Sequence, residues 1–440
     1  MKNFIETIKN IWKIEELKNR ILLTLGLLLI YRFGSHVTLP GIDANALAGL
    51  SNQTSKGIGS ILDMFTGGSF SKASIFALGI MPYISASIVV QLMGIAIPYL
   101  QKLQKDGESG RKKLNQITRW LTILITLLQG PGYIYNLYKT IPQSAFLLGA
   151  DSPWFLFSSV LILTTGTIFA MWLGEKITDK GIGNGISLLI MIGIISRLPF
   201  AITSEFGSRL QSSGGGLIMF LLEIVFLLFI IVSCILLVQG TRRIPVQYAK
   251  KIVGNKQIGG VRQYLPLKVN AAGVMPIIFA QAIMFIPAAV AGLSKSETSQ
   301  SVASEFSNMF GFWYNFVFAL LILIFTYFYT AITVPTNKMA DDLKRSGGFI
   351  PGIKPGVETA DFLDKIMSLI TFPGALFLAL IAVFPAIVVS LDVQQSWAMF
   401  YGGTSLIIMV GVAIDTIQQI NTYLLNKHYD GLMKSGKNRK

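Results

Sequence analysis

The sequence has few of the cysteine and histidine side chains that often serve in catalysis and metal binding. It has one cysteine, Cys234, which lies inside an apolar run, so an intrachain disulfide is excluded. Its two histidines, His36 and His428, lie near opposite ends of the chain, and neither GxSxG nor HExxH occurs. A histidine-based metal cluster and a nucleophile–base pair are therefore excluded. We expect no catalytic residue, no metal and no cofactor.

Charged residues are scarce as well. Only 13% of the 440 residues are charged and 52% are hydrophobic, whereas about 25% of the residues in a soluble domain are charged. The mean hydropathy is +0.59. The apolar residues form runs of about twenty, the length that crosses a hydrocarbon core of ~30 Å. These runs predict an all-α polytopic membrane protein with ten spans, at 21–39, 74–98, 118–138, 154–174, 184–202, 216–239, 271–292, 313–334, 367–390 and 398–421.

The residues before the first span form an amphipathic pattern. Apolar side chains recur there at helical spacing with lysines between them, namely Phe4, Ile5, Ile8, Ile11, Trp12 and Leu17. This pattern predicts a helix over 1–20 that lies on the inner membrane surface. An A-x-A match at Ala46 and Ala48 lies too far beyond the first apolar run for signal cleavage, so we expect that span to be retained.

Lysine and arginine are distributed unequally between the two sides of the predicted spans. If the N-terminus is cytoplasmic, the cytoplasmic segments hold 30 of the 37 basic residues. Because basic loops stay in the cytoplasm, we expect both termini to be cytoplasmic. The net charge of +15 is then a topology signal first, and it does not by itself indicate nucleic-acid binding.

Two predicted cytoplasmic loops, 240–269 and 336–366, are longer than topology requires. The first alternates Ile244 and Val246 with polar residues and turns near Gly254, which predicts a two-stranded ribbon. The second contains RSGGFIPGIKPG, whose glycines and prolines exclude a long helix and indicate a shaped tip. The two loops are either solvated basic segments or a docking platform for a large acidic partner, and the residues alone favour neither.

Ionisable residues inside the spans are the usual pointer to solute transport, and here they are few. They are Arg32, Arg197, Glu223 and Asp415, with Glu175 at the edge of a span. The two arginines are close enough to span ends for their side chains to reach the membrane surface. A proton- or sodium-coupled transporter usually concentrates carboxylates at mid-membrane. A secondary transporter is therefore weakly supported, and a polytopic membrane enzyme less so.

Helix-weakening residues mark the region around the second span. The stretch FALGIMPYISASIVVQ, residues 76–91, contains Gly79, Pro82 and Gln91. Before it, GIGSILDMFTGGSFS (57–71) has a short apolar centre bracketed by glycines, too short to cross a membrane. Such a segment is either a re-entrant half-helix that lines a cavity or a surface turn, and on the residues alone the surface turn is favoured.

Five motifs, in this order along the chain, resemble the SecY family of bacterial protein-conducting channels. They are FALGIMPYISASIVVQ, GEKITDKGIGNGISLLI, LPLKVNAAGVMPIIFA, SGGFIPGIKPG and YGGTSLIIMV. The resemblance implies ten helices in two inverted halves, 21–202 and 203–425, followed by a basic tail over 426–440. It also implies a lateral gate, formed by spans two and three against spans seven and eight, through which the halves open.

The resemblance further assigns roles to three sets of residues. A hydrophobic ring would consist of Ile80, Ile84, Ile186, Ile190, Ile278 and Ile408. A plug over about 58–71 would be centred on Ile61, Leu62, Met64 and Phe65. Docking to partners would use Arg242, Arg243, Lys250, Lys251, Lys344, Arg345 and Lys354. Where the family has arginine in GIRPG this sequence has Lys354, which keeps the charge but loses the planar fork.

The function implied by the resemblance is passage of unfolded polypeptides across the bacterial plasma membrane. Hydrophobic segments would leave sideways into the lipid bilayer. The implied partners are the small membrane subunits SecE and SecG, the SecA motor, the ribosome, and secretory and membrane-protein precursors. Such a channel makes and breaks no covalent bond and is not an enzyme. The alternative left by the residues is a secondary transporter of small solutes.

Overall fold

The computed structural model describes residues 12, 14–47, 63–142, 145–146, 152–211, 216–248, 251–253, 256–258, 262–293 and 308–437. The chain divides into two compact units, Met1–Thr203 with Val412–Lys440, and Ser204–Gly411. Each unit has a packed core of its own. Most of the predicted surface helix over 1–20 lies outside the described residues, and α2 begins at Glu15.

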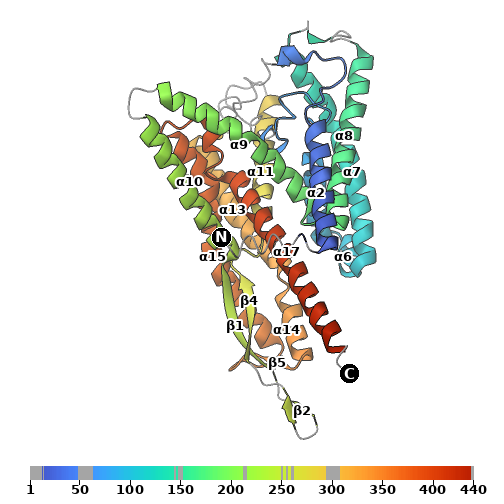
Figure 1. Ribbon diagram of the computed structural model, residues 1–440, viewed down its shortest axis with the longest axis vertical. Coiled ribbons are helices and arrows are strands. Elements are labelled where there is room, and N and C mark those ends of the chain that lie inside the picture. The colour runs from blue at the N-terminus through green and yellow to red at the C-terminus, as the bar shows by residue number, and fades with distance from the viewer. Residues whose placement is uncertain are drawn as a thin grey trace. The chain divides into compact units, whose positions relative to one another are not determined.

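The first unit is a bundle of helices (Figure 1). Its elements are α2 (Glu15–Gly34), η1 (Ala44–Leu47), α5 (Met81–Ala96), α6 (Pro98–Lys105), α7 (Gly107–Thr140), α8 (Pro153–Lys180), α9 (Gly185–Gln211) as far as Thr203, and α17 (Gly403–Lys437) from Val412. Helix α8 packs against α2, α5 and α7. Buried apolar side chains between residues 39 and 163 form the core.

Small residues bring the helices of this unit close together. Thr118, Thr122 and Thr126 form a buried stripe along α7, and each hydroxyl donates to the carbonyl four residues earlier. A Cβ added at Gly166 of α8 would lie 2.1 Å from the carbonyl oxygen of Ile75, so only glycine fits there. Apolar helices gain no hydrophobic free energy when they associate within lipid. Close packing between their backbones stabilises the association instead.

Helix α5 begins seven residues later than the predicted start of the second span. Residues 75–80 form turns, and Gly79 has a φ of 53°, a left-handed conformation that favours glycine. Pro82 lies in the first turn of α5, where its missing N–H costs no helical hydrogen bond. At its other end the helix bends by 107° into α6 at a break before Pro98. Gly79 and Pro82 therefore mark the N-terminal boundary of helix α5.

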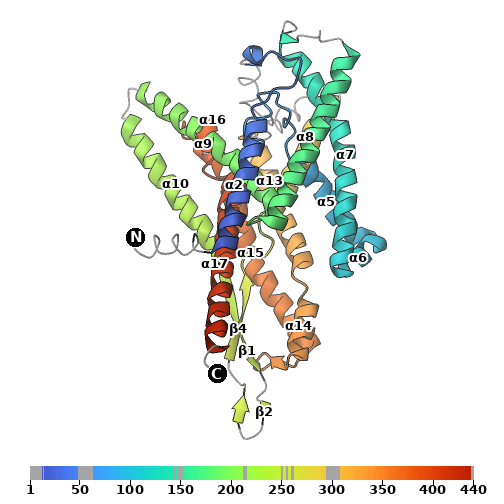
Figure 2. The same ribbon diagram turned by 45° about the vertical axis from the view of Figure 1, so that its right-hand side comes forward.

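The second unit combines helices with a small sheet (Figure 2). Its elements are the end of α9, α10 (Gly216–Gln239), β1 (Thr241–Tyr248), β2 (Lys251–Val253), β3 (Lys256–Ile258), β4 (Arg262–Lys268), α11 (Met275–Leu293), α13 (Phe312–Thr333), α14 (Thr336–Arg345), β5 (Gly348–Phe349), α15 (Val357–Val389), α16 (Gln395–Ala398) and the start of α17. Helix α13 packs against α11 and α15. Strands β1 and β4 extend from the end of α10, with β2 beyond them.

The predicted ribbon in the loop 240–269 is confirmed. Strands β1 and β4 pair antiparallel from Thr241 opposite Lys268, β5 joins the other side of β1, and β2 pairs with β3. Successive side chains of a strand point to opposite faces. Ile244 and Val246 therefore share one face of β1, and they belong to a buried core that includes side chains of α15. We call residues 241–268 with 336–367 the sheet subdomain.

Each of the ten predicted spans contains a helix of the described residues. Six helical segments are long and apolar enough to cross a membrane, namely α8, α9, α10, α13 with α14, α15, and α16 with α17. The bent pair α5 and α6 passes the same criteria when it is taken as one span. The all-α fold class is therefore confirmed, whereas the number of ten crossings stays a prediction.

Candidate functional site

An irregular stretch of the first unit is buried along nearly its whole length. This stretch, residues 63–80, is named here the anchored segment, and only Lys72 within it is exposed. Asp63 closes its first turn, because Oδ1 accepts the N–H of Ser71 at 2.8 Å and the main-chain carbonyl accepts the N–H of Gly68 at 2.8 Å. A buried backbone outside helices and strands needs such partners for its polar groups.

Two arginines from neighbouring helices contact the anchored segment. Arg32 of α2 donates through Nη1 to the carbonyl oxygen of Gly67 at 2.7 Å. Arg197 of α9 forms an ion pair with Asp63 and donates through Nη2 to the hydroxyl of Ser71 at 3.1 Å. The sequence suggested that both side chains reach the membrane surface, but both instead bind this segment. Charge-assisted bonds of this kind are the strong ones in proteins.

Helix α9 approaches the anchored segment closely because two glycines meet. A Cβ at Gly67 would lie 2.8 Å from the Cα of Gly193, and a Cβ at Gly193 would lie 2.7 Å from the carbonyl oxygen of Phe65. Gly67 has a φ of 64°, which other residues rarely adopt. Gly193 and Arg197 lie one turn apart on α9, so one face of the helix provides both the close contact and the charge.

Further hydrogen bonds from other elements hold the backbone of the anchored segment. The hydroxyl of Tyr133 donates to the carbonyl oxygen of Phe70 at 2.8 Å, and the two rings meet edge to face. The N–H of Leu39 donates to the carbonyl oxygen of Ala73 at 2.8 Å. The segment is thus fixed from several sides by groups of α2, α7 and α9 and by the chain that follows α2.

The electrostatic balance around the segment is positive. Arg32 lies near both Lys72 and Arg197, and of these three cations Arg197 forms an ion pair with Asp63. Partial burial and the positive charge of Arg32 lower the pKa of Lys72. The carbonyl oxygen of Gly67 therefore stabilises the guanidinium group of Arg32, and the hydroxyl of Ser71 stabilises that of Arg197 together with Asp63.

Sequence reasoning missed these anchors. Asp63 is the only acidic residue in 57–71, and Arg32 and Arg197 are the only arginines within the first five predicted spans apart from Arg119 at a span end. This isolated set of opposite charges in apolar surroundings was the available signal. Of the predicted plug residues, Phe65 is buried and Met64 is half-buried, whereas Ile61 and Leu62 lie outside the described residues.

The predicted ring isoleucines are divided between the two units. Ile80, Ile84, Ile186 and Ile190 lie in the first unit, and Ile278 and Ile408 lie in the second. Ile80, Ile190 and Ile408 are buried, and the other three are half-buried. Within the first unit, Ile80 and Ile84 lie one turn apart at the start of α5, and Ile186 and Ile190 lie one turn apart on the face of α9 that continues to Gly193.

The sheet subdomain separates the two predicted docking arginines. Ile244 and Val246 of β1 are buried, so Arg242 shares their inner face and Arg243 points to the outer one. By the register, Arg243 stands opposite Pro266 of β4. The outer face also carries Arg262, Tyr264 and Lys268, all of them exposed.

The remaining predicted docking residues have different surroundings. Lys344 and Arg345 are exposed in the last turn of α14, where a positive charge is favourable to the helix dipole. Lys354 forms an exposed ion pair with Glu358 at 3.4 Å, which contributes little to stability. Lys250 lies outside the described residues, as does the side chain of Lys251.

Two of the acidic residues named in the predicted spans, Glu223 and Glu175, pair with arginines, whereas Asp415 is exposed. Glu223 of α10 pairs with Arg209 at 2.7 Å, and Arg209 also pairs with Glu205 at 2.8 Å. Glu175 accepts two bonds from Arg119. Among the described residues no group of three or more histidine, cysteine, aspartate or glutamate side chains is arranged to hold a metal ion. These acids tie helices together.

Comparison with known proteins gives consistent results. A model of the SecY family matches residues 74–417. The chain is similar to the protein translocase subunit SecY of Halalkalibacterium halodurans, with 41% identity over 437 residues that cover 97% of this chain and 99% of that one. It is similar in fold to a SecY structure whose plug domain stabilises the closed channel, with a TM-score of 0.59, 17% identity, and coverage of 92% and 91%. It is also similar to Sec61 in a canine ribosome-channel complex, with a TM-score of 0.53, 14% identity, and coverage of 92% and 91%.

Proposed function

The chain belongs to the SecY family, and we propose that it forms the protein-conducting channel of a bacterial translocase. It passes unfolded polypeptides across the plasma membrane and releases hydrophobic segments sideways into the bilayer. The observation that carries the mechanism is the anchored segment, which is buried, packs Phe70 into the core of the first unit, and is also held by polar contacts with two arginines. Polar contacts of this kind can be exchanged for water when the segment leaves, so the closed state is stable without being permanent.

The described part of the plug is the beginning of the anchored segment, residues 63–71. In the closed channel Arg32 and Arg197 hold it through Gly67, Ser71 and Asp63. A passing polypeptide displaces the segment and breaks these contacts together. Because the two arginines come from α2 and α9, a small movement of either helix weakens the anchorage on one side.

The six isoleucines named above form the hydrophobic ring of the pore. A polar filter cannot suit every side chain of a passing polypeptide, whereas branched aliphatic groups form no hydrogen bonds that must be broken. A narrow apolar constriction also excludes ions, because it loses its water. Isoleucine is stiff at χ1 and lacks polar atoms, which suits it to both tasks.

The outer face of the sheet subdomain docks the partner that drives transport. Arg243, Arg262 and Lys268 surround Tyr264 there, and neither β1 nor β4 contains an acidic residue. This combination suits an acidic surface of the SecA motor or the phosphates of ribosomal RNA. Lys344, Arg345 and the hairpin of β2 and β3 extend the same basic subdomain.

The channel works as one subunit of a complex. SecE and SecG are its small membrane partners, and both of its termini lie in the cytoplasm, as the distribution of basic residues indicates. The chain itself is not an enzyme. SecA or the translating ribosome supplies the energy for transport.

A reversible lock on the anchored segment tests this function. Ser196 Oγ lies 3.1 Å from the position of a Cβ at Gly67, close to the separation between the sulfur and the opposite Cβ in a disulfide. We expect the Gly67→Cys/Ser196→Cys variant in vesicles to lose import of a protease-sensitive precursor on oxidation and to regain it on reduction. The single variant Ser196→Cys is the control. A secondary transporter would import no precursor in either state, and equal import by the oxidised and reduced double variant would contradict the plug.

A further inference from the structure

The turn between α8 and α9 is short, buried and rich in glycine. Residues 181–185, with the sequence GIGNG, are named here the α9 seat, and only Asn184 among them is exposed. Gly183 has a φ of 82°, a left-handed conformation that favours glycine. A Cβ at Gly185 would collide with the carbonyl oxygen of Gly174, so the first residue of α9 lies directly against the backbone of α8. The seat therefore brings the two helices together without room for larger side chains.

Side chains of two helices that are distant in the sequence bind the backbone of the α9 seat. Thr24 of α2 accepts the N–H of Ile182 through its hydroxyl at 3.1 Å. Gln419 of α17 accepts the N–H of Gly183 through Oε1 at 2.9 Å. All four residues belong to the first unit. Backbone N–H groups at the start of a helix need such partners, because the helix itself provides none for them.

Two nearer side chains bind further N–H groups at the start of α9. Thr178 of α8 accepts the N–H of Gly185 at 2.9 Å, and the side chain of Asn184 accepts the N–H of Ser187 at 3.3 Å. The beginning of α9 is therefore held by α2, α8 and α17 as well as by its own turn. Hydrogen bonds weaken steeply when their direction changes, so these bonds together define the height and the rotation of α9.

Thr24 is the most deeply buried of these partners, with an exposed fraction of 7%. Its hydroxyl is used twice, because it also donates to the carbonyl oxygen of Arg20 at 2.8 Å. The guanidinium group of Arg20 lies 5.1 Å from the centre of the ring of Tyr423, which joins α2 to α17 beside the seat. Without the hydroxyl, the buried N–H of Ile182 would lose this partner, and an unpaired buried donor costs more than a hydrogen bond contributes.

The part of α9 that follows the seat carries groups that the proposed function uses. They are two ring isoleucines and two residues that contact the anchored segment, namely Ile186, Ile190, Gly193 and Arg197. Their spacing of three and four residues places them on one face of the helix. No proline interrupts α9 between the seat and Arg197. A shift or rotation of the first turn would therefore move the whole face.

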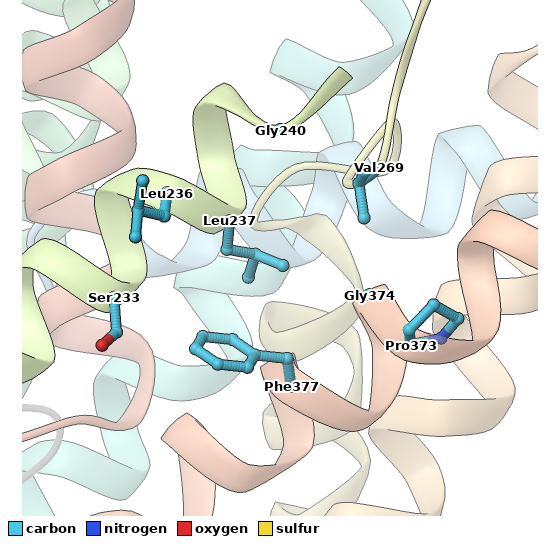
Figure 3. A pocket seen from close by; sticks show the side chains of 8 residues that line it. All are labelled: Ser233, Leu236, Leu237, Gly240, Val269, Pro373, Gly374 and Phe377. Atoms are coloured by element: carbon cyan, nitrogen blue, oxygen red, sulfur yellow. The ribbon is translucent and has the colours of Figure 1, made fainter. Parts of the chain in front are cut away.

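The end of α10 in the second unit is held differently (Figure 3). Leu237 and Phe377 project into an apolar pocket of about 370 Å³ between α10 and α15, and Val269 closes it from the side of the sheet. The N–H of Val269 donates to the carbonyl oxygen of Gly240 at 2.9 Å, so this bond joins two backbone groups. Apolar contacts are non-directional. The α9 seat therefore specifies the position of its helix more narrowly than this pocket does.

We propose that Thr24 and Gln419 are positioning residues for α9. They hold the first turn of the helix at one height and one rotation, and they thereby set the positions of Ile186, Ile190 and Arg197. Their effect on the closed state rests on the proposed function, since it requires that the ring and the plug close the pore.

Thiol labelling tests the proposal in a chain with Cys234→Ala and Ile194→Cys. Ile194 of α9 is 0% exposed, and a thiol in apolar surroundings is inert, so N-ethylmaleimide reacts there only when α9 leaves its place. We expect Thr24→Val, which keeps the shape but loses the hydroxyl, to raise the labelling rate about fivefold or more. Thr24→Ser retains the hydroxyl and should restore the slow rate. Gln419→Met should raise the rate about twofold, because this side chain is exposed, and Gln419→Glu, which keeps an acceptor, should not.

Thr122→Val is the matched control for Thr24→Val. The hydroxyl of Thr122 is also buried in the first unit, but it donates within α7, to the carbonyl oxygen of Thr118. Leu237→Ala removes apolar packing from the pocket of the second unit. Neither control should change the labelling rate. An unchanged rate in both Thr24→Val and Gln419→Met would overturn the proposal, as would an equal rise in Thr122→Val.

Ion conductance of the same variants separates this inference from the channel function. If the ring and the plug close the pore, Thr24→Val should raise the resting conductance together with the labelling rate, and Thr24→Ser should raise neither. Faster labelling without increased conductance would confirm that the two residues position α9, and it would contradict the roles proposed for the isoleucines and the anchored segment.

Discussion

Arg32 and Arg197 lie against the anchored segment of the first unit, whereas Arg242 and Arg243 stand exposed on the sheet subdomain of the second. The guanidinium groups of the first pair bind a carbonyl oxygen, a hydroxyl and a carboxylate within the protein. The second pair has no acidic partner among the described residues. Under the function proposed above, the arginines bound within the fold hold the plug in place, and the exposed arginines dock a partner. The same side chain would then serve closure of the channel in one region and binding of a partner in the other.

Removing Arg197 should have the largest effect. Loss of one partner from a fully buried ion pair costs about 3–5 kcal/mol. Because the side chain of Arg197 is 26% exposed, we expect Arg197→Met to weaken the closed state by about 2 kcal/mol. The open population would then rise about thirtyfold. Ion conductance of the resting channel in a planar bilayer measures this rise.

The control for this variant is Arg119→Met, which breaks the ion pair with Glu175 elsewhere in the first unit. That pair does not contact the anchored segment, so conductance should stay at the level of the unmodified chain. If both variants conduct equally, Arg197 does not hold the plug closed, and the contrast between inward and outward arginines fails.

Gly193→Ala should have an intermediate effect. The added methyl group would lie 2.7 Å from the carbonyl oxygen of Phe65 and would push the anchored segment away from α9. A strain of about 1 kcal/mol would raise the resting conductance about fivefold. Gly207→Ala on the same helix is the control, because a Cβ there meets nothing within 4 Å. A leak in the control as large as that of Gly193→Ala would argue for a general weakening of α9.

Arg243→Glu should have the smallest effect, and one confined to docking. An exposed charge contact contributes roughly 1 kcal/mol, so the affinity for the motor or the ribosome should fall about fivefold. Arg242→Glu should change this affinity less, because Arg242 shares the inner face of β1. Surface plasmon resonance with the immobilised complex measures both variants. A larger loss for Arg242→Glu would reverse the assignment of the two faces, and conductance should change in neither variant.

Much of the fold could be predicted from the sequence, because long apolar runs and alternating strands leave clear patterns. Each predicted span contains a helix, and the ribbon around Ile244 and Val246 forms as expected. The start of α5 was missed by seven residues. Apolarity continues through residues 75–80, so it did not reveal that Gly79 turns the chain there.

The contacts that hold the anchored segment could not be predicted in the same way. Asp63 and Arg197 are 134 positions apart in the sequence, and no periodic pattern relates them. Gly193 resembled any other small residue of a membrane helix, and only its contact with Gly67 gives it a role. The isoleucines remain a prediction, since a branched side chain in a span serves packing and pore lining equally well.

Crosslinking of a trapped translocating polypeptide tests the central claim most directly. In a chain with Cys234→Ala, single cysteines would replace Ile84, Ile190 or Ile408, and a precursor with a bulky folded end would be arrested during transport. We predict disulfide crosslinks from the precursor to all three positions. Leu124 of α7 and Leu228 of α10, which are 55% and 56% exposed, provide control positions. Crosslinks at the three isoleucines and none at the leucines would establish the polypeptide path. Equal crosslinking at all five positions, or none at the isoleucines, would contradict it.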